Sequence, residues 1–525
     1  MRTRLMIFAL AIVLVFGAAA NPGAAQEMQP QLKLLLTYRT GVFDEGAAEI
    51  AAFDAAGKQI FVINGAKDAV DVLDFSQTDT LTLKTSLDVE EYGSPTSVAV
   101  RDGVVAVAVK NDQELGKAVF FSTNGMQLSV VTVGAGPDML TFSPDGKYVL
   151  VANEGEPSGD YTNDPEGSVS IIDLSGGATA LTDANVTTAS FADFNEGGSR
   201  AAELDAKVNI YGPNASVAQD LEPEYIAVTA DSTKAYVTLQ ENNAVAVIDI
   251  ATAKVDAIVA LGYKDHNLPG MGLDTSDEDG KINIANYPIF GMYQPDAIVT
   301  FEANGATYLI TANEGDTREY DAFSEETEIG DLKLDPATFP NAADLQKSEV
   351  AGRLNVTNTL GDENGDGMNE AIYVFGARSF SIWDAAGALV YDSGDELERR
   401  TAEAYPEDFN SDNAENDSFD NRSDNKGPEP EGVTVGVLDG RTYAFVGLER
   451  IGGIMVYDVT DPKMPVFVQY INNRDFSGDP QADTAGDLGP EGLVFVPADQ
   501  SPTGNALLIV ANEVSGSIGV YSFSK

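Results

Sequence analysis

Acidic residues recur at one position of a repeated apolar pattern. "VANE" at 151–154 and 510–513, and "TANE" at 311–314, each end an alternating apolar run in a glutamate. A second acid stands near the start of the same units, as in "GPDMLTFSPDGKYVLVANEGE" from 136. Carboxylates at fixed places in a repeat can bind cations, exchange protons, or accept backbone N–H bonds in a turn.

The units that carry these acids share one plan. Each has an acid, an alternating strand, a turn, a second strand ending in Asn or Glu, and a third strand ending "V-x-D". Clear copies start at 136, 222, 294, 429 and 489, and weaker ones at 47 and 94. A repeated sheet of about four strands predicts an all-β fold, a β-propeller. Segment 371–394 can either complete the blade opened at Asp296 or form an eighth blade. Of these alternatives we favour seven blades.

The two ends of the chain are expected to meet. The last unit stops one strand short, and "LKLLLTY" at 32–38 is strand-like without a partner. This N-terminal strand would complete the last blade and leave no open sheet edge. The organisation predicted is a single propeller domain over 26–525, with insertions near 195–222, 262–294 and 315–370.

Propeller geometry predicts that the acids gather. The first strand of a blade lines the channel and the second runs antiparallel to it, so the start of one and the end of the other lie at the same mouth. The expected pairs are Asp138 with Glu154, Glu224 with Glu241, Asp296 with Glu314, Glu431 with Glu449, and Glu491 with Glu513. Glu49 and Asn64 extend this ring, whereas Thr96 and Lys110 interrupt it.

The ring has two interpretations. Ionising all of several neighbouring carboxylates costs electrostatic free energy, because like charges repel, so we predict that the ring binds cations. The alternative is that these acids accept backbone N–H bonds as a structural device of the repeated turn.

A second cation site is predicted in "DENGDGMNE" at 362–370. Its spacing would place Asp362, Asn364, Asp366 and Glu370 around one centre, with Gly367 in the tight turn. Tyr373 occupies the twelfth position, so the loop is no EF-hand; it is similar to the shorter calcium loop of integrin-type propellers. Two other acidic loops, 274–283 (Asp274, Asp277, Asp279) and 408–427, are interpreted as solvated surface.

Composition narrows the chemistry. The chain has 83 acidic and 31 basic residues, a net charge of −52, which disfavours nucleic acid and anionic lipid as partners. Without cysteine, thiolate catalysis and thiolate metal sites are excluded, and His266 is the only histidine. We therefore expect calcium, or another divalent metal bound by oxygen.

The N-terminus has the layout of a secretory signal peptide. Arg2 and Arg4 precede an apolar run over 5–16 and then small residues, with cleavage after Ala20 or Ala25. A retained anchor is the alternative, but the run is shorter than the roughly 20 residues that a span needs. The prediction is a signal peptide over 1–25 and a secreted or periplasmic protein without a membrane span after cleavage.

Several motifs together resemble one family. "TYRTGVFDEGAAEIAAFD" (37–54), "ANEGE", "ANEGD", "GARSFSIWD" (376–384) and "SFDNRSDNKGPEPEGV" (418–433) are similar to the choice-of-anchor I family of secreted bacterial propeller proteins. The resemblance implies fold and export. Some members are labelled alkaline phosphatases and others resemble a mesenchyme cell-surface glycoprotein. We expect no C-terminal anchor, since the chain ends at Lys525.

Two functional hypotheses remain. In the first, a calcium-stabilised binding or surface protein recognises a protein or glycan through its mouth and insertions. In the second, metals held by the ring make a phosphoesterase for a phosphorylated small molecule. Its candidate catalytic residues are Glu154, Glu314, Glu431, Glu513, Arg318 and Arg378, with Arg422 and Arg450 also beside ring motifs. Convergence of acids and arginines on one cavity would favour chemistry, although each arginine has an ordinary salt bridge as its alternative.

Overall fold

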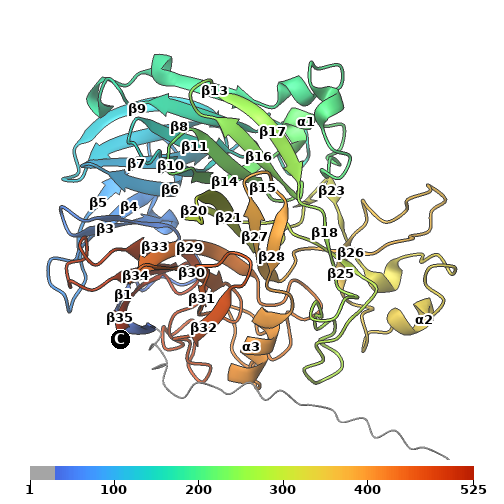
Figure 1. Ribbon diagram of the computed structural model, residues 1–525. Helices are drawn as coiled ribbons and strands as arrows, with labels where there is room; N and C mark the ends of the chain where they lie inside the picture. Colours follow the sequence, from blue (N-terminus) through green and yellow to red (C-terminus); the bar gives the residue numbers. More distant parts are fainter. Residues whose placement is uncertain (1–29, 525) are drawn as a thin grey trace, which may run out of the picture.

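The computed structural model describes residues 30–524. These residues form seven antiparallel sheets of four strands, arranged as a ring (Figure 1). The signal peptide predicted for 1–25 lies outside the described residues.

The sheets follow one another along the chain. The first contains β2 (Ala51–Asp54), β3 (Gln59–Asn64), β4 (Ala69–Asp74) and β5 (Thr82–Asp88). The second contains β6 (Ser94–Arg101), β7 (Val104–Asn111), β8 (Glu114–Ser122) and β9 (Gln127–Ala135). The third contains β10 (Pro137–Phe142), β11 (Tyr148–Asn153), β12 (Ser168–Asp173) and β13 (Val186–Ser190). The fourth contains β14 (Pro223–Val228), β15 (Lys234–Leu239), β16 (Ala244–Asp249) and β17 (Lys254–Ala260).

The last three sheets are less regular in their connections. The fifth contains β20 (Ile298–Ala303), β21 (Ala306–Asn313), β27 (Ser379–Asp384) and β28 (Leu389–Asp392). The sixth contains β29 (Pro430–Leu438), β30 (Arg441–Leu448), β31 (Ile454–Asp458) and β32 (Val466–Ile471). The seventh contains β33 (Pro490–Val496), β34 (Leu507–Asn512), β35 (Ser517–Ser524) and β1 (Gln31–Arg39). Segment 371–394 thus supplies the two outer strands of the sheet opened by β20.

The ring closes on itself. The first strands contact each other in the order β2, β6, β10, β14, β20, β29 and β33, and β33 contacts β2. As the sequence predicted, β1 pairs antiparallel with β35, with Leu32 opposite Phe523 and Thr37 opposite Gly519. The side chain of Gln469 clamps Leu32 by accepting from its N–H at 2.8 Å and donating to its carbonyl at 3.0 Å. The fold is therefore a β-propeller whose termini share a sheet.

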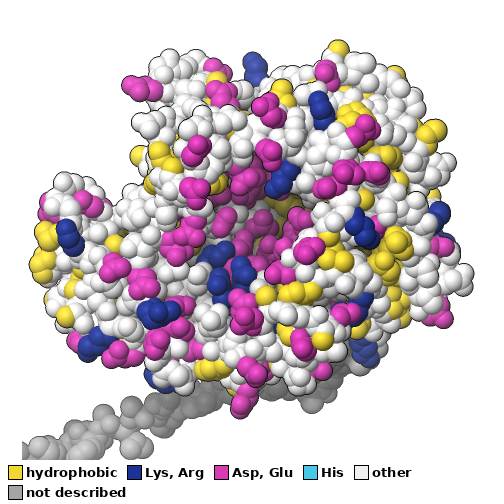
Figure 2. Space-filling view, turned by 180° about the vertical axis from the view of Figure 1, so that it is seen from behind, with side chains coloured by type: hydrophobic (Ala, Val, Ile, Leu, Met, Phe, Trp, Pro, Cys, Tyr) yellow, Lys and Arg dark blue, Asp and Glu magenta, His cyan; other side chains and the backbone are white. Residues whose placement is uncertain are grey.

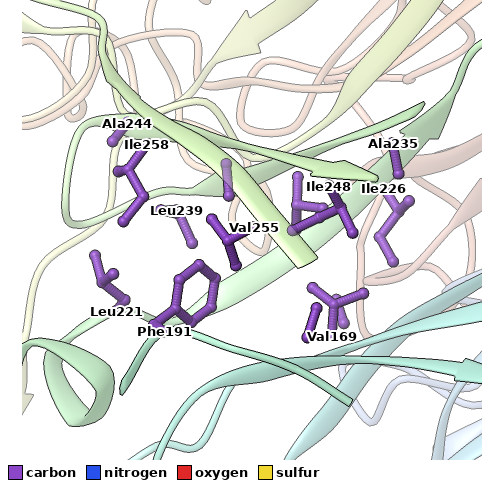
Figure 3. Packing of buried hydrophobic residues seen from close by; sticks show 14 of the residues in the cluster. Val169, Phe191, Leu221, Ile226, Ala235, Leu239, Ala244, Ile248, Val255 and Ile258 are labelled. Atoms are coloured by element: carbon purple, nitrogen blue, oxygen red, sulfur yellow. The ribbon is translucent and has the colours of Figure 1, made fainter. Parts of the chain in front are cut away.

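Apolar side chains between neighbouring sheets form the core. Val169 and Phe191 of the third sheet and its following loop pack against Ile226, Leu239 and Ile248 of the fourth (Figure 3). The second and third strands have neighbours on both faces, so β3 is buried over its whole length. Strands buried on both faces read as near-continuous apolar runs, of which "VLVAN" at 149–153 and "AVAVID" at 244–249 are examples.

The insertions form structure of their own. The strands β18 (Tyr263–Asp265), β19 (Phe290–Met292), β24 (Glu326–Glu328), β25 (Asn355–Thr357) and β26 (Tyr373–Val374) make a five-stranded sheet. With α2 (Ala342–Leu345) it projects from one side of the ring (Figure 1) and has its own apolar cluster, including Leu273, Phe339 and Leu354. Three further short elements lie outside the seven four-stranded sheets. They are the hairpin of β22 (Glu319–Tyr320) and β23 (Phe323–Ser324), helix α1 (Val217–Asp220) and helix α3 (Glu396–Ala404). The insertions predicted at 262–294 and 315–370 therefore build one body, because each alone has too few strands to bury an apolar face.

Closure by β1 is testable with a core truncation. Leu32 is 1% exposed and packs with Tyr443, Phe445 and Leu508, so Leu32→Ala should lower the free energy of unfolding by about 2–5 kcal/mol. The measurement is denaturant unfolding followed by the fluorescence of Trp383, the only tryptophan. Leu34→Ala, on the same strand but 41% exposed, is the control and should change it by about 0.5 kcal/mol or less. Equal effects would contradict the packing of β1.

Candidate functional site

A β-bulge places an acid on the first strand of several blades. Pro137 pairs with Asn153 and the next pair joins Leu140 to Val151, so Asp138 and Met139 oppose a single residue. The same shift follows Pro223, Pro430 and Pro490. Proline lacks the N–H that a regular ladder needs, and a bulge re-aims the side chain it carries. The bulged residues include Asp138, Glu224, Glu431 and Glu491, which are the acids expected to open the units.

The acid that ends each second strand is placed by one repeated backbone bond. The N–H groups of Glu154, Glu449 and Glu513 donate to the carbonyls of Gly136, Glu429 and Gly489 at 2.7–2.8 Å. This bond brings the end of the second strand next to the start of the first. It uses the backbone of the glutamate, so the turn itself does not need the carboxylate.

Four acids that stand in or just before the first strand of their sheet meet at the channel axis. Glu49, Asp138, Asp296 and Glu491 line a cavity of about 80 Å³ together with Thr96 and Tyr225. Figure 2 shows acidic side chains gathered in the central hollow of one face. Burial, then repulsion from Glu513 and Asp138, raises the pKa of Glu49 to about 8, and burial raises that of Asp138 to about 6. The channel therefore concentrates negative charge that water does not fully screen.

Two carboxylate triads flank this channel with the same construction. In each, the acid ending one blade's second strand meets two acids of the next blade, and the three ligand oxygens lie within 4.8 Å of one another. The first triad is Glu154, Glu222 and Glu241, and the second triad is Glu314, Glu429 and Glu449. The repeat has thus made the same three-oxygen arrangement twice.

Cationic side chains fill the second triad. The Nζ of Lys426 lies 2.6 Å from Glu314 and 3.1 Å from Glu429, and the Nε of Arg450 lies 2.9 Å from Glu429. Arg422 adds a further ion pair with Glu429 at 2.6 Å. Although burial opposes it, Lys426, Arg450 and Arg422 hold the pKa of Glu429 well below its usual range. The second triad is balanced by the chain itself.

The first triad has no comparable balance. Arg318 lies 3.0 Å from Glu222, but it also pairs with Asp220 at 2.6 Å, which offsets its charge. One oxygen each of Glu222 and Glu241 is buried without a hydrogen-bond partner in the described chain, and so is one of Glu224. Burial, partly opposed by Arg318, raises the pKa of Glu222 to about 8, and burial with repulsion from neighbouring acids raises those of Glu154 and Glu241. Of the two triads, the first has more negative charge that is not paired with a cationic side chain, so it is better suited to an added cation.

The remaining predicted residues are spread unevenly. Glu431 is half-buried beside Glu449 and Glu491, and Glu513 neighbours Glu49 and Glu491. Lys110, which interrupts the ring, faces it: although burial opposes the shift, the carboxylates of Glu156, Glu154, Asp138 and Glu49 raise its pKa. Arg318 and Arg450 form salt bridges with acids of the triads, which is the alternative role predicted for these arginines from the sequence. Arg378 makes no bond to the ring and instead binds Glu398 and three backbone carbonyls.

The loop at 362–370 joins β25 to β26, as its strand-like flanks predicted. It is exposed, and the oxygens of Asp362 accept N–H bonds from Gly365, Asp366 and Gly367 at 2.8–3.1 Å. Glu370 accepts from Asn364 at 2.5 Å and from the N–H of Glu363 at 2.9 Å. The loop is closed by its own bonds, and calcium there stays a prediction.

Sequence reasoning missed Glu222, Glu429 and Lys426. The signal for Glu222 and Glu429 is "EPE" at 222–224 and at 429–431, which puts an acid on each side of the proline. The first acid joins a triad and the second enters the bulge. Interpreting loops 274–283 and 408–427 as solvated surface was wrong for Asp274 and Asp420, which are 0% and 1% exposed.

The choice-of-anchor I domain matches residues 49–462. The chain belongs to the choice-of-anchor I family. The match covers the first five sheets, three of the four strands of the sixth, and both triads. This membership indicates an extracellular or surface protein. Among the described residues, no helix has the length and apolarity to cross a membrane.

Two curated relatives share part of this domain. Gigasin-3a of Magallana gigas is 31% identical over 192 residues, which are 34% of this chain and 66% of the relative. The mesenchyme-specific cell surface glycoprotein of Strongylocentrotus purpuratus is 29% identical over 284 residues, which are 47% of this chain and 36% of the relative. The chain thus spans less than two thirds of the length of either relative.

Solved structures resemble the chain only loosely. Hydrazine synthase of Kuenenia stuttgartiensis has a TM-score of 0.47 at 14% identity, covering 92% of this chain and 99% of that one. The β-propeller domain of Cps50 (Swd1) from Myceliophteria thermophila has a TM-score of 0.43 at 9% identity, covering 94% and 100%. The propeller is established by the sheets of this chain.

Removing the internal cation of the second triad should create a cation site. Lys426→Met leaves Glu314 without its ion pair, so we expect a loss of about 3–5 kcal/mol in the free energy of unfolding. Added calcium should stabilise this variant by more than it stabilises the wild type, measured by chemical denaturation with calcium or chelator. Lys347→Met, which removes an exposed ion pair, should cost about 1 kcal/mol or less and show no such extra stabilisation. Loss without extra stabilisation by calcium would contradict the likeness of the triads.

The raised pKa of Glu222 predicts a pH dependence of stability in the metal-free protein. Between its usual value of 4.5 and the folded value of about 8, the folded state holds a proton that the unfolded state has lost. Its stabilising contribution is therefore complete below 4.5 and is lost as the pH rises to 8. Glu222→Gln should flatten the fall in unfolding free energy between pH 5 and 8, where each unit of pKa shift corresponds to about 1.4 kcal/mol. The exposed Glu114→Gln is the control, and equal slopes in all three proteins would contradict the assignment.

Proposed function

We propose that the protein is an exported, calcium-dependent binding protein of the cell surface or extracellular space. The first triad supports this proposal, since three carboxylates converge there with buried, unpartnered oxygens and one shared arginine. Calcium takes six to eight oxygen ligands and suits carboxylates supplied by loops. A bound calcium would offset the repulsion that raises the pKa values of Glu154 and Glu241.

The surroundings of the first triad suit a ligand. Tyr161 and Tyr320 lie edge to face with ring centroids 5.3 Å apart, and the four acids Glu222, Glu156, Glu241 and Glu154 raise the pKa of Tyr320 after burial does. The loop of Tyr161 and the β22–β23 hairpin are joined by a backbone bond from Ala322 to Gly159 at 3.0 Å. Open coordination positions on a calcium ion bind hydroxyl or carboxylate oxygens, and aromatic faces pack on apolar ones. A glycan or a protein side chain offers both.

The phosphoesterase alternative has weaker support. It requires guanidinium groups free to hold phosphate oxygens. Arg318 is 2% exposed and occupied by Asp220 and Glu222, while Arg378 is occupied by Glu398 away from the ring. These contacts favour binding over hydrolysis. The name of the Strongylocentrotus purpuratus relative, a mesenchyme-specific cell surface glycoprotein, is in keeping with a surface role.

The proposal predicts that calcium stabilises the protein through the first triad. At about 100 times its Kd, calcium should add about 2.7 kcal/mol to the free energy of unfolding. Glu241→Gln should remove the part of this increment that the first triad supplies, so the difference in melting temperature between calcium and chelator should be smaller than in the wild type. Glu449→Gln changes the equivalent residue of the second triad and should keep the wild-type difference, because Lys426 and Arg450 already occupy that triad.

Hydrolysis of p-nitrophenyl phosphate separates the two functions. The binding proposal expects no calcium-dependent turnover by the purified protein. Calcium-dependent turnover that disappears in Glu154→Gln would overturn the proposal and favour the phosphoesterase. Equal calcium stabilisation of the wild type and of Glu241→Gln would also overturn it.

A further inference from the structure

A second buried polar network lies around Arg378, away from the channel ring. Its guanidinium donates to the carbonyl of Asp274 at 2.6 Å, to Glu398 at 2.7 Å, and to the carbonyls of Ser423 and Asn425 at 2.9 and 2.6 Å. It thereby joins three segments that are far apart in sequence: the 274–283 loop, helix α3 and the 408–427 loop. Arg378 itself has a positive φ of 49°, which its four acceptors hold in place.

Hydrogen bonds link the acids of these segments. Asn410 donates its amide to Glu398 at 3.0 Å and to the hydroxyl of Ser423 at 2.9 Å, and that hydroxyl donates to Asp420 Oδ1 at 2.6 Å. The N–H of Asp274 donates to the other oxygen of Glu398 at 3.2 Å. Asp274, Asn410 and Asp420 therefore lie in one continuous network, and each is at most 1% exposed.

Each member of this network has an oxygen left over. Within the described chain, Asp274 Oδ1, Asn410 Oδ1, Asp420 Oδ2 and the hydroxyl of the adjacent Ser411 are buried without a hydrogen-bond partner. Asp279 Oδ2 is in the same state apart from an ion pair at 3.1 Å to Lys281, whose side chain is 61% exposed. Buried polar atoms in folded proteins are nearly always satisfied, and each orphan costs about 1–3 kcal/mol. Arg378 Nε is an orphaned donor of the same network, but the orphans of the Asp, Asn and Ser side chains are oxygens, and what satisfies these must present positive charge or donors.

The charge of the network selects a cation over water alone. Asp274, Asp279, Asp420 and Glu398 face only Arg378 and the exposed Lys281. Burial, then repulsion from Asp274, Asp279 and Glu398, raises the pKa of Asp420 to about 7. Water relieves the missing hydrogen bonds but not the repulsion. A divalent ion relieves both.

We propose that Asp274, Asn410, Ser411 and Asp420 hold a calcium ion that fastens the 408–427 loop to the 274–283 loop. Carboxylate, amide and hydroxyl oxygens from separate loops are the mixed set that calcium accepts, whereas magnesium prefers to keep its water shell. The ion would have a structural role. The 408–427 loop carries Asn413, Arg422 and Lys426, which bind Glu449, Glu429 and Glu314 of the second triad. Calcium at this place would thus position the cations that balance the channel mouth.

The test locates and counts the ion in the full-length mature protein. Crystals soaked in terbium chloride should give an anomalous peak between Asp274, Asn410 and Asp420. Calcium per chain, measured by elemental mass spectrometry after dialysis against micromolar calcium, should fall by about one ion in Ser411→Ala and in Asp420→Asn. Glu278→Gln, an exposed acid of the same loop, is the matched control and should keep it.

The result separates this site from the first triad. Glu241→Gln should leave the terbium peak at Asp420 in place, whether or not the triad binds calcium. No peak at this position, or an unchanged calcium count in Ser411→Ala, would overturn the proposal even if Asp420→Asn fails to fold. A count that falls equally in Glu278→Gln would overturn it too, because the loss would then reflect general charge.

Discussion

Mutual repulsion of buried carboxylates at the propeller axis is the constraint on which this structure depends. The repeat brings an acid to the axis from nearly every blade, and four of these acids line one cavity of about 80 Å³ between the first strands. Unpaired charge in such a place is expensive, so the molecule must supply protons, internal cations or bound ions. Each remaining feature of the mouth can be understood as one of these three responses.

The internal cations come mostly from outside the repeat. Lys426 and Arg422 stand in the 408–427 loop, and Arg318 stands beside the β22–β23 hairpin. A blade has only the start of its first strand and the end of its second strand to offer at the mouth, and in most blades acids take both positions; Lys110 of the second sheet is the cationic exception. Loops between blades have no such restriction, which explains why these insertions are folded back against the ring.

The two triads show what one difference in a loop can do. They share three glutamates in the same blade positions, yet Lys426 and Arg450 fill one, while in the other Arg318 is shared with Asp220. Equal backbone geometry therefore leads to an internally balanced site and to a site suited to an external cation. The first triad is where we propose that calcium and a ligand bind, beside the aromatic pair Tyr161 and Tyr320.

The sequence by itself determined the repeat, its strands and the position of the acids at one mouth. Alternating apolar residues and a proline before each bulge are local signals, so Asp138, Glu154 and Glu431 could be placed from spacing alone, as could the pairing of 32–38 with the last sheet. Tertiary structure alone decided which acids meet which cations. Lys426 reaches Glu314 across 112 positions of sequence, and Asp274 meets Glu398 across 124, through loops without periodicity. Contacts of that kind depend on how irregular segments pack, and no local pattern of residue types encodes the packing.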